Sequence, residues 1–138
     1  ILINNFDNIH IFNLALSNKK KKIEMWVSDI KRTGGFSVFN KNDEELKKYN
    51  LTYSELTQSD LADNMLDIKN SNIAIKIDVE RHEEEVLLGA SKLLTENKVI
   101  IQIEIFDERK KKVFDILKNY KYQLYNSIGK DYYFRNFI

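Results

Sequence analysis

The sequence predicts an α/β fold, because two kinds of apolar pattern alternate in its second half. Residues 73–79 and 99–106 form nearly continuous apolar runs, which are typical of parallel strands buried on both faces. Each run is followed by a segment, 83–96 or 108–120, whose apolar residues recur at helical spacing. Because alternating strands and helices build helix-covered sheets, we expect these four segments to form one layered domain.

Size and composition indicate one ordinary globular domain. The chain has 138 residues, about the length of a single domain. Hydrophobic residues make up 43% and aromatic residues 12%, a balance that excludes a disordered chain. The 22 Lys and Arg residues nearly match the 21 Asp and Glu residues, so no nucleic-acid partner is expected. No apolar run is long enough to span a membrane and no signal peptide is recognisable, which predicts a cytoplasmic protein.

Two strands are predicted in the N-terminal region. Residues 9–16 are apolar and β-branched, and residues 23–28 alternate loosely, so the pair could form a hairpin. The four lysines between them, at 19–22, indicate either a solvated turn or a contact to phosphate or nucleic acid.

The middle of the chain is predicted to be a loop followed by two short helices. Residues 33–37 contain the Gly-Gly pair, which indicates a loop, and no phosphate-binding glycine motif occurs in the sequence. Segments 41–49 and 52–66 are expected to be helical, with Asp43 as a candidate cap for the first.

The C-terminal elements follow clear patterns. The helix at 83–96 presents one apolar stripe and the helix at 108–120 a second. Residues 122–125 and 132–134 form two short aromatic strands, which are expected to pair antiparallel. We expect the aromatic side chains of this region to cover the sheet and fill the core, in preference to forming a stacking platform. These side chains are Tyr120, Tyr122, Tyr125, Tyr132, Tyr133 and Phe134.

Acidic residues stand where the two predicted parallel strands end. Asp78 and Glu80 close the first strand, and Glu104 closes the second. Because ligands of open α/β sheets bind beyond the carboxyl ends of the strands, these carboxylates are candidates for a general base, a hydroxyl-binding group or a metal site. Alternatively, Asp78 and Glu80 cap the following helix.

Two further polar residues near these strand ends allow more than one interpretation. Lys76 either pairs with an acid such as Glu104 or extends into solvent. His82 has either a packing role or an active-site role. Because the chain has no cysteine and only two histidines, it cannot form a disulfide, a Cys-ligated metal site or a zinc site built mainly from His.

Several segments together resemble the FkbM-type family of S-adenosylmethionine-dependent methyltransferases. Residues 75–80 and 85–90 are similar to the family pattern I-K-I-D-V-E-G-x-E-x-x-V-L-x-G-A, and residues 101–105 to a following strand that ends in an acid. Weaker similarities cover most of the remaining chain: residues 8–17 resemble a strand ending in A-L-S, residues 33–37 a Gly-Gly loop, and residues 131–134 the last strand.

The resemblance implies a Rossmann-like class I methyltransferase sheet with flanking helices. It implies S-adenosylmethionine as cofactor, no metal, and methyl transfer to a hydroxyl of a small molecule or glycan, such as a sugar or natural product. On this basis Asp78 is the expected base or acceptor-orienting group, with Glu80 beside it and His82 as a lesser catalytic candidate. The implied cofactor contacts are Ala15, Leu16 and Ser17, and the implied substrate contacts are Gly35, Arg81 and Glu104.

Two departures from the family pattern change the expectation. Arg81 stands where the family usually has glycine, which could alter substrate choice or weaken turnover. The family's first strand, its glycine-rich cofactor loop and its ribose-binding acid would all lie upstream of residues 9–16. We therefore expect residues 1–138 to be a single, N-terminally truncated domain. By itself it should bind cofactor weakly or not at all, and it should expose apolar strand edges that favour self-association.

Two other functions are compatible with the same residues. The chain could be a catalytically inactive methyltransferase remnant that acts as an interaction module. It could also be a metal-dependent nuclease or hydrolase that uses Asp78, Glu80 and Glu104. The common nuclease pattern E-x-K is missing, however, because Ile105 and Phe106 follow Glu104.

Overall fold

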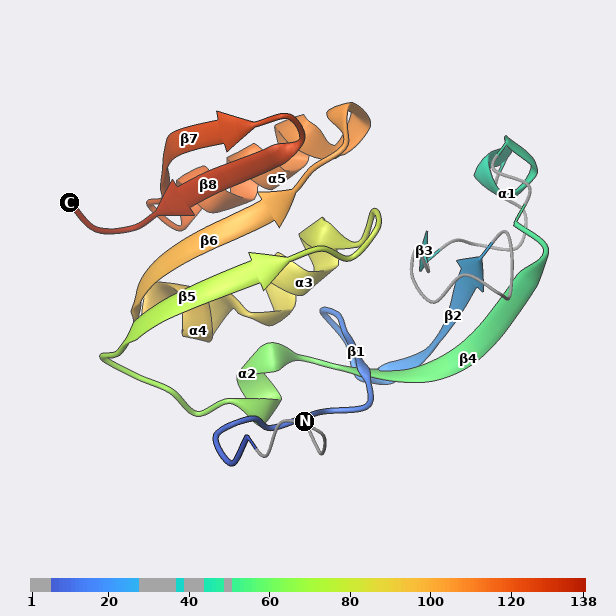
Figure 1. Cartoon of the computed structure of the whole chain (residues 1–138), viewed down its shortest axis with the longest axis horizontal. Helices are drawn as coiled ribbons and strands as arrows, with labels where there is room; N and C mark the ends of the chain where they lie inside the picture. The colour runs from blue at the N-terminus through green and yellow to red at the C-terminus, as the bar shows by residue number, and fades with distance from the viewer. Residues whose placement is uncertain (1–5, 28–36, 39–43, 49–50) are drawn as a thin grey trace.

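The computed structural model describes residues 6–27, 37–38, 44–48 and 51–138, which form two four-stranded sheets with helices (Figure 1). One sheet has the strand order β5-β6-β8-β7 and the other β1-β4-β2-β3. The strands are β1 (Ala15–Leu16), β2 (Lys21–Val27), β3 (Ser37–Val38), β4 (Tyr53–Asp60), β5 (Asn72–Ile77), β6 (Lys98–Glu104), β7 (Gln123–Ile128) and β8 (Asp131–Arg135). The helices are α1 (Glu44–Lys48), α2 (Ala62–Met65), α3 (Glu83–Gly89), α4 (Ser91–Thr95) and α5 (Asp107–Asn119).

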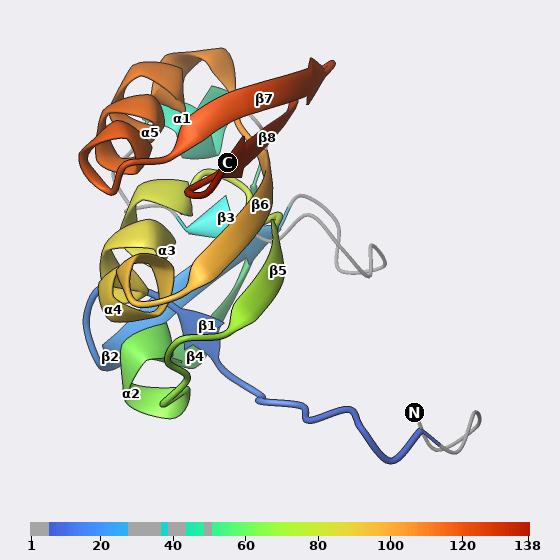
Figure 2. The same cartoon turned by 90° about the vertical axis from the view of Figure 1, so that its left-hand side faces the viewer.

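The C-terminal sheet confirms the predicted α/β arrangement. Strands β5 and β6 are parallel, with Ile75 opposite Ile101, and β8 runs antiparallel to β6. The last two strands, β7 and β8, pair antiparallel as expected. Helices α3, α4 and α5 lie against one face of this sheet, and none of the described helices covers the opposite face (Figure 2).

Strands β5 and β6 are buried on one face, whereas the sequence predicted burial on both faces. Along β6, Val99 and Ile101 are fully buried, whereas Ile100 between them is exposed. Along β5, Ala74 and Lys76 are exposed. The prediction of strands buried on both faces is therefore wrong for the described residues, because helices cover only one face of the sheet (Figure 2).

The hydrophobic core lies between the covered face of the C-terminal sheet and its helices. Phe114 of α5 packs edge-on against Tyr132 and Phe134 of β8, with ring centroids 5.4 and 5.0 Å apart. Such edge-to-face contacts add to the stabilisation from buried area. Three of the six aromatic residues predicted to line the core are buried and Tyr125 is exposed. The core residues are Ala62, Ile77, Val86, Leu87, Ala90, Leu93, Leu94, Val99, Ile101, Ile103, Ile105, Val113, Leu117, Tyr122, Tyr132 and Phe134.

The predicted helix at 83–96 is divided into two helices at Ala90. A side chain from another element explains the division. The Asp63 carboxylate of α2 accepts hydrogen bonds from the backbone N–H groups of Lys92 and Leu93, each at 2.9 Å. These N–H groups belong to the first turn of α4, where no preceding carbonyl is available to accept them. Asp63 therefore stabilises the start of a new helix.

Residues 52–66 are mostly strand, so the prediction of a helix there is wrong. Strand β4 pairs antiparallel with β2 and parallel with β1, which gives it partners on both edges. The buried hydroxyl of Ser59 lies 2.8 Å from the Lys19 carbonyl and 2.9 Å from that of Lys21. Only α2 remains of the predicted helix. Pairing with two strands outweighs the local helical preference.

The predicted strand at 9–16 is also largely wrong. Within the described residues only Ala15 and Leu16 form a strand, and they pair with β4. The hairpin prediction fails for the same reason, because β2 pairs with β4 and β3. A strand needs a hydrogen-bonded neighbour, and no described strand pairs with residues 9–14.

Other predictions can be compared only in part. The helix predicted at 41–49 is present as α1, whereas residues 41–43, including Asp43, and residue 49 lie outside the described residues. The Gly-Gly loop at 33–36 also lies outside them. No helix in the described part of the chain is both long and apolar enough to cross a bilayer.

Candidate functional site

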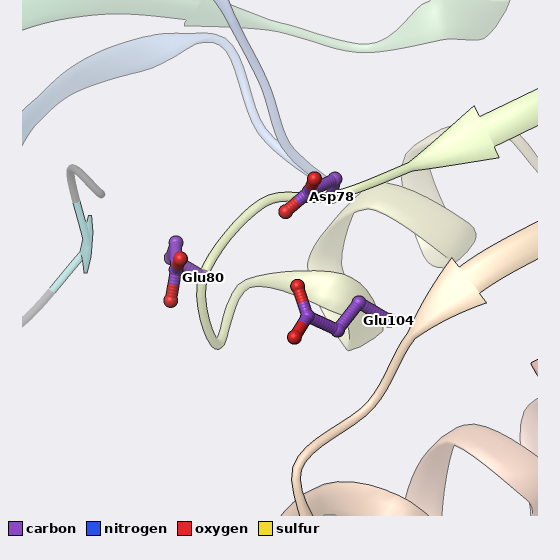
Figure 3. Close-up of side chains that lie close together, drawn as sticks. All are labelled: Asp78, Glu80 and Glu104. Carbon is purple, nitrogen blue, oxygen red and sulfur yellow. The ribbon is translucent and has the colours of Figure 1, made fainter. Parts of the chain in front are cut away.

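Three carboxylates converge beyond the carboxyl ends of β5 and β6 (Figure 3). Asp78 follows β5, Glu80 lies in the loop before α3, and Glu104 ends β6. Their nearest oxygens all lie within 4.8 Å of one another. Because β5 and β6 are adjacent and parallel, their ends reach the same edge of the sheet. The sequence predicted this meeting of carboxylates, and the structure brings the three together.

A sharply turned backbone places Glu80 in this acidic cluster, which consists of Asp78, Glu80 and Glu104. Glu80 has φ 45° and Arg81 has φ 76°, both in the left-handed region that disfavours residues with a Cβ. The buried Glu83 carboxylate stabilises the turn by accepting a hydrogen bond from the Arg81 backbone N–H at 2.8 Å. The left-handed backbone at Arg81 explains why glycine suits this position in the pattern that the sequence resembles.

The Arg81 side chain is committed to helix α5. Its guanidinium forms an ion pair with Glu108 and lies over the ring of Phe106, 4.9 Å from the centroid. The side chain is also largely buried. The predicted substrate contact by Arg81 would require these interactions to break. Gly35, the other predicted substrate contact in the loop region, lies outside the described residues.

Lys76 pairs with Asp78 and not with Glu104. The Lys76 Nζ atom lies 2.8 Å from Oδ2 of Asp78. This hydrogen bond raises the pKa of Lys76, and the charges of Asp78, Asp131 and Glu104 add to the effect. Both side chains of the pair are exposed, so the ion pair contributes little to stability. It supplies one positive charge beside the acidic cluster.

Glu104 has the altered acidity expected of a proton acceptor. Burial raises its pKa, and the negative charges of Asp78, Glu80 and Asp131 raise it further. A carboxylate with a raised pKa is a stronger base and takes up a proton more readily. The donor set alone identifies no metal site, because exposed carboxylates often cluster without an ion.

The repulsion in the acidic cluster predicts that Glu104→Gln stabilises the protein at pH 7. The pKa of Glu104 is higher in the folded protein than in the unfolded protein. At a pH above the unfolded-state pKa, ionised Glu104 therefore destabilises the folded state. At a pH below it, Glu104 is protonated in both states and the penalty disappears. Because Glu104 is only partly buried, we expect a rise in Tm of a few degrees at most.

Thermal unfolding at pH 7 and at pH 4 measures this effect. The rise should shrink at pH 4, where Glu104 is already largely protonated. Gln102→Glu is the matched opposite change on the same strand and should lower Tm at pH 7. A Glu104→Gln protein less stable than wild type at pH 7 would contradict the repulsion.

A pocket of about 330 Å³ lies beside Asp78. One wall comes from the segment that contains β1 and the other from the loop between β5 and α3. Most of its lining is apolar, and Asp78 and His82 are its polar groups. The pocket is lined by Leu14, Ala15, Leu16, Met25, Asp78, Val79 and His82.

Two of the three predicted cofactor contacts line this pocket. Ala15 and Leu16 belong to its lining. Ser17 is buried, and its hydroxyl lies 3.0 Å from Nε2 of His82. Sequence reasoning did not anticipate Met25 as a wall residue, because the strand pattern of β2 does not show which neighbour each side chain faces.

His82 lies in the pocket wall and not in the acidic cluster. It is the residue before α3 and is buried. Its Nδ1 atom lies 3.4 Å from Oε2 of Glu85. Burial lowers the pKa of His82, with Glu85 opposing the shift and Lys21 and Arg109 adding to it. A neutral imidazole at pH 7 follows.

The alternative helix-capping role for the acidic residues is not observed. Among the described residues, no side chain forms a cap hydrogen bond at the start of α3. Asp78 instead pairs with Lys76, and Glu80 faces the other two carboxylates of the acidic cluster. A second pocket of about 370 Å³, beside β5, has an almost wholly apolar lining that includes Leu66, Ile75 and Leu94 and contains no carboxylate.

Comparison with known proteins gives a family match. The sequence model of the Methyltransferase FkbM domain matches residues 2–124. The matched region contains the acidic cluster and both walls of the pocket beside Asp78. No curated protein and no solved structure matches the chain significantly.

Proposed function

The chain belongs to the FkbM methyltransferase domain family, and we propose that it acts in O-methylation with S-adenosylmethionine as methyl donor. The observation that supports the proposal is the position of the acidic cluster, which shares Asp78 with the pocket lined by Ala15 and Leu16. A proton-accepting group thus lies next to a space with apolar walls. The proposed acceptor is a hydroxyl of a sugar or natural product.

The residues present fit part of the cofactor. S-adenosylmethionine combines a flat adenine with a positively charged sulfur. Ala15, Leu16 and Val79 offer apolar surface for a flat ring, and the Asp78 carboxylate offers a negative charge for a cation. The volume of about 330 Å³ lies at the lower end of the range for small-molecule sites.

The proposed mechanism divides the work between the pocket and the acidic cluster. The cofactor, when bound, supplies a methyl group on a positively charged sulfur. Asp78 takes up the proton that the acceptor hydroxyl loses, or orients that hydroxyl toward the pocket. Glu104 and Glu80 accept hydrogen bonds from neighbouring hydroxyls of the acceptor. The apolar wall, including Met25, keeps water from the reacting atoms.

Titration with S-adenosylhomocysteine, followed by the NMR signals of the backbone amides, tests the cofactor part of the proposal. We expect weak, saturable shifts of amide signals that are confined to the pocket, with Ala15, Leu16 and Val79 among the most affected. Ala15→Trp should abolish the shifts by filling the pocket. Leu56→Trp places the same ring on the exposed surface of β4 and should leave them unchanged. Shifts absent up to millimolar ligand, or scattered over the surface, would contradict the proposal.

The same titration separates the alternative functions. An inactive remnant that serves as an interaction module predicts no pocket-specific shifts with S-adenosylhomocysteine. If the chain is a metal-dependent nuclease, the amide signals of Asp78, Glu80 and Glu104 should shift when Mg²⁺ is added in place of S-adenosylhomocysteine. Calorimetry with Mg²⁺ gives an independent measurement of that second outcome.

A further inference from the structure

One side-chain contact joins the two walls of the pocket beside Asp78. Ser17 directly follows the β1 wall, and His82 belongs to the opposite wall. The Ser17 hydroxyl oxygen and Nε2 of His82 are 3.0 Å apart, and the two residues are 65 positions apart in the sequence. Both side chains are buried, so water does not compete for this contact. The contact therefore lies between the two walls of the pocket.

The surroundings of His82 determine which ring nitrogen carries the proton. Oε2 of Glu85 lies 3.4 Å from Nδ1, is buried and has no hydrogen-bond partner among the described residues. A negative oxygen at this position favours a proton on Nδ1. Nε2 is then the acceptor, and the Ser17 hydroxyl donates to it. The positive charges of Lys21 and Arg109 disfavour a second proton on the ring.

Ser17 is itself held in place on two further sides. Its backbone N–H donates to the Asp60 carbonyl at 2.9 Å. Its own carbonyl lies so close to Gly89 of α3 that a Cβ on Gly89 would collide with it. The order serine, histidine, glutamate resembles a hydrolytic triad, but the Ser17 side chain is fully buried and no substrate reaches it. The arrangement is therefore suited to holding the wall and not to nucleophilic attack.

We propose that His82 is a positioning residue. Its neutral imidazole, protonated on Nδ1 and facing Glu85, accepts a hydrogen bond from Ser17 and fixes the β1 wall of the pocket relative to Asp78. The identity of the pocket's ligand rests on the proposed function. The position of the proton on His82 and the Ser17–His82 contact, which we call the joint between the walls, do not depend on that function.

Imidazole ¹⁵N spectroscopy tests the proton position without any ligand. The chain has two histidines, so His10→Gln leaves His82 as the single signal. At pH 7 we expect Nδ1 to carry the proton and Nε2 to be an unprotonated acceptor. Ser17→Ala should shift the Nε2 resonance toward that of a free acceptor. A protonated Nε2 in wild type would overturn the assignment.

Ligand-free amide spectra test the joint between the walls. We expect His82→Ala and Ser17→Ala to displace or broaden the Ala15 and Leu16 signals, and His82→Gln, whose amide oxygen can reach Ser17, to restore them in part. Tyr122→Phe is the matched control. It also removes one buried side-chain hydrogen bond, from Tyr122 to the Leu94 carbonyl at 2.9 Å, and should leave both signals in place. If the Ala15 and Leu16 signals are unchanged in His82→Ala, the Ser17–His82 contact does not hold the β1 wall in place.

Affinity for S-adenosylhomocysteine connects the joint to the proposed function. We expect His82→Ala and Ser17→Ala each to weaken binding about threefold to tenfold. The double variant should be no weaker than either single variant, because both remove the same contact. Wild type that binds no S-adenosylhomocysteine contradicts the proposed function alone. Additive losses in the double variant contradict the positioning role alone.

Discussion

Asp78→Asn is expected to lower the rate of methyl transfer about 10²- to 10⁴-fold, the usual contribution of a positioned general base. The substitution keeps the shape of the side chain and removes the charge that accepts a proton. Asp78 belongs both to the acidic cluster and to the pocket. Its loss therefore affects removal of the proton from the acceptor hydroxyl beside the pocket. Because the pocket walls remain, affinity for S-adenosylhomocysteine should change much less than kcat.

Formation of S-adenosylhomocysteine, with a panel of methyl glycosides as hydroxyl acceptors, measures this effect. Asp67→Asn is the matched control, because Asp67 also pairs with a lysine two positions away, with Lys69 Nζ 3.8 Å from its Oδ1. That variant should retain wild-type kcat. An Asp78→Asn protein within threefold of wild type would exclude Asp78 as the base. Wild type inactive on every glycoside would exclude this acceptor class.

The second half of the fold was predictable because its signals are local and strong. Strands β5 and β6 and helix α5 begin and end within two residues of the predicted bounds. The spacing of apolar residues in each of these segments fits one type of secondary structure well and the other poorly. The division at Ala90 was not predictable. It depends on Asp63, a side chain that the fold brings from α2 to the start of α4.

The first half was poorly predicted because its structure depends on partners distant in the sequence. Residues 53–60 become strand β4 through pairing with β1 and β2, and the Ser59 hydroxyl donates to the backbone carbonyls of Lys19 and Lys21. Residues 9–14 have strand-forming side chains and no described neighbour. In both cases pairing decides the structure and local propensity does not.

The candidate site was predictable to the extent that topology determines it. Parallel strands that are neighbours end at the same edge of a sheet, so the sequence predicted that Asp78 and Glu104 would meet if β5 and β6 were adjacent, as they are. The Ser17–His82 contact joins residues 65 positions apart, and no local pattern signals it. Arg81 shows a third case, because its left-handed backbone and its contact with Glu108 both depend on the surrounding structure.

Gly89→Ala is expected to destabilise the protein by about 2–3 kcal/mol, the upper part of the usual cost of overpacking, although helix propensity alone predicts stabilisation. Alanine is favoured over glycine inside a helix by about 1 kcal/mol. At this position, however, a Cβ would lie 2.8 Å from the carbonyl carbon of Ser17 and closer still to its oxygen. Both are backbone atoms, so no rotamer change relieves the overlap and α3 must move away from the β1 segment. Forced overpacking of this kind outweighs the gain in propensity.

Urea unfolding measures the stability change, and amide spectra locate it. Gly129→Ala is the matched control, because Gly129 has φ 61° in the turn between β7 and β8 with open space around it. That variant should lose about 1 kcal/mol from backbone strain alone and leave the pocket unchanged. Gly89→Ala should in addition displace the Ala15 signal and break the Ser17–His82 contact. A Gly89→Ala protein as stable as wild type would mean that β1 does not pack against α3 in solution as it does in the structure.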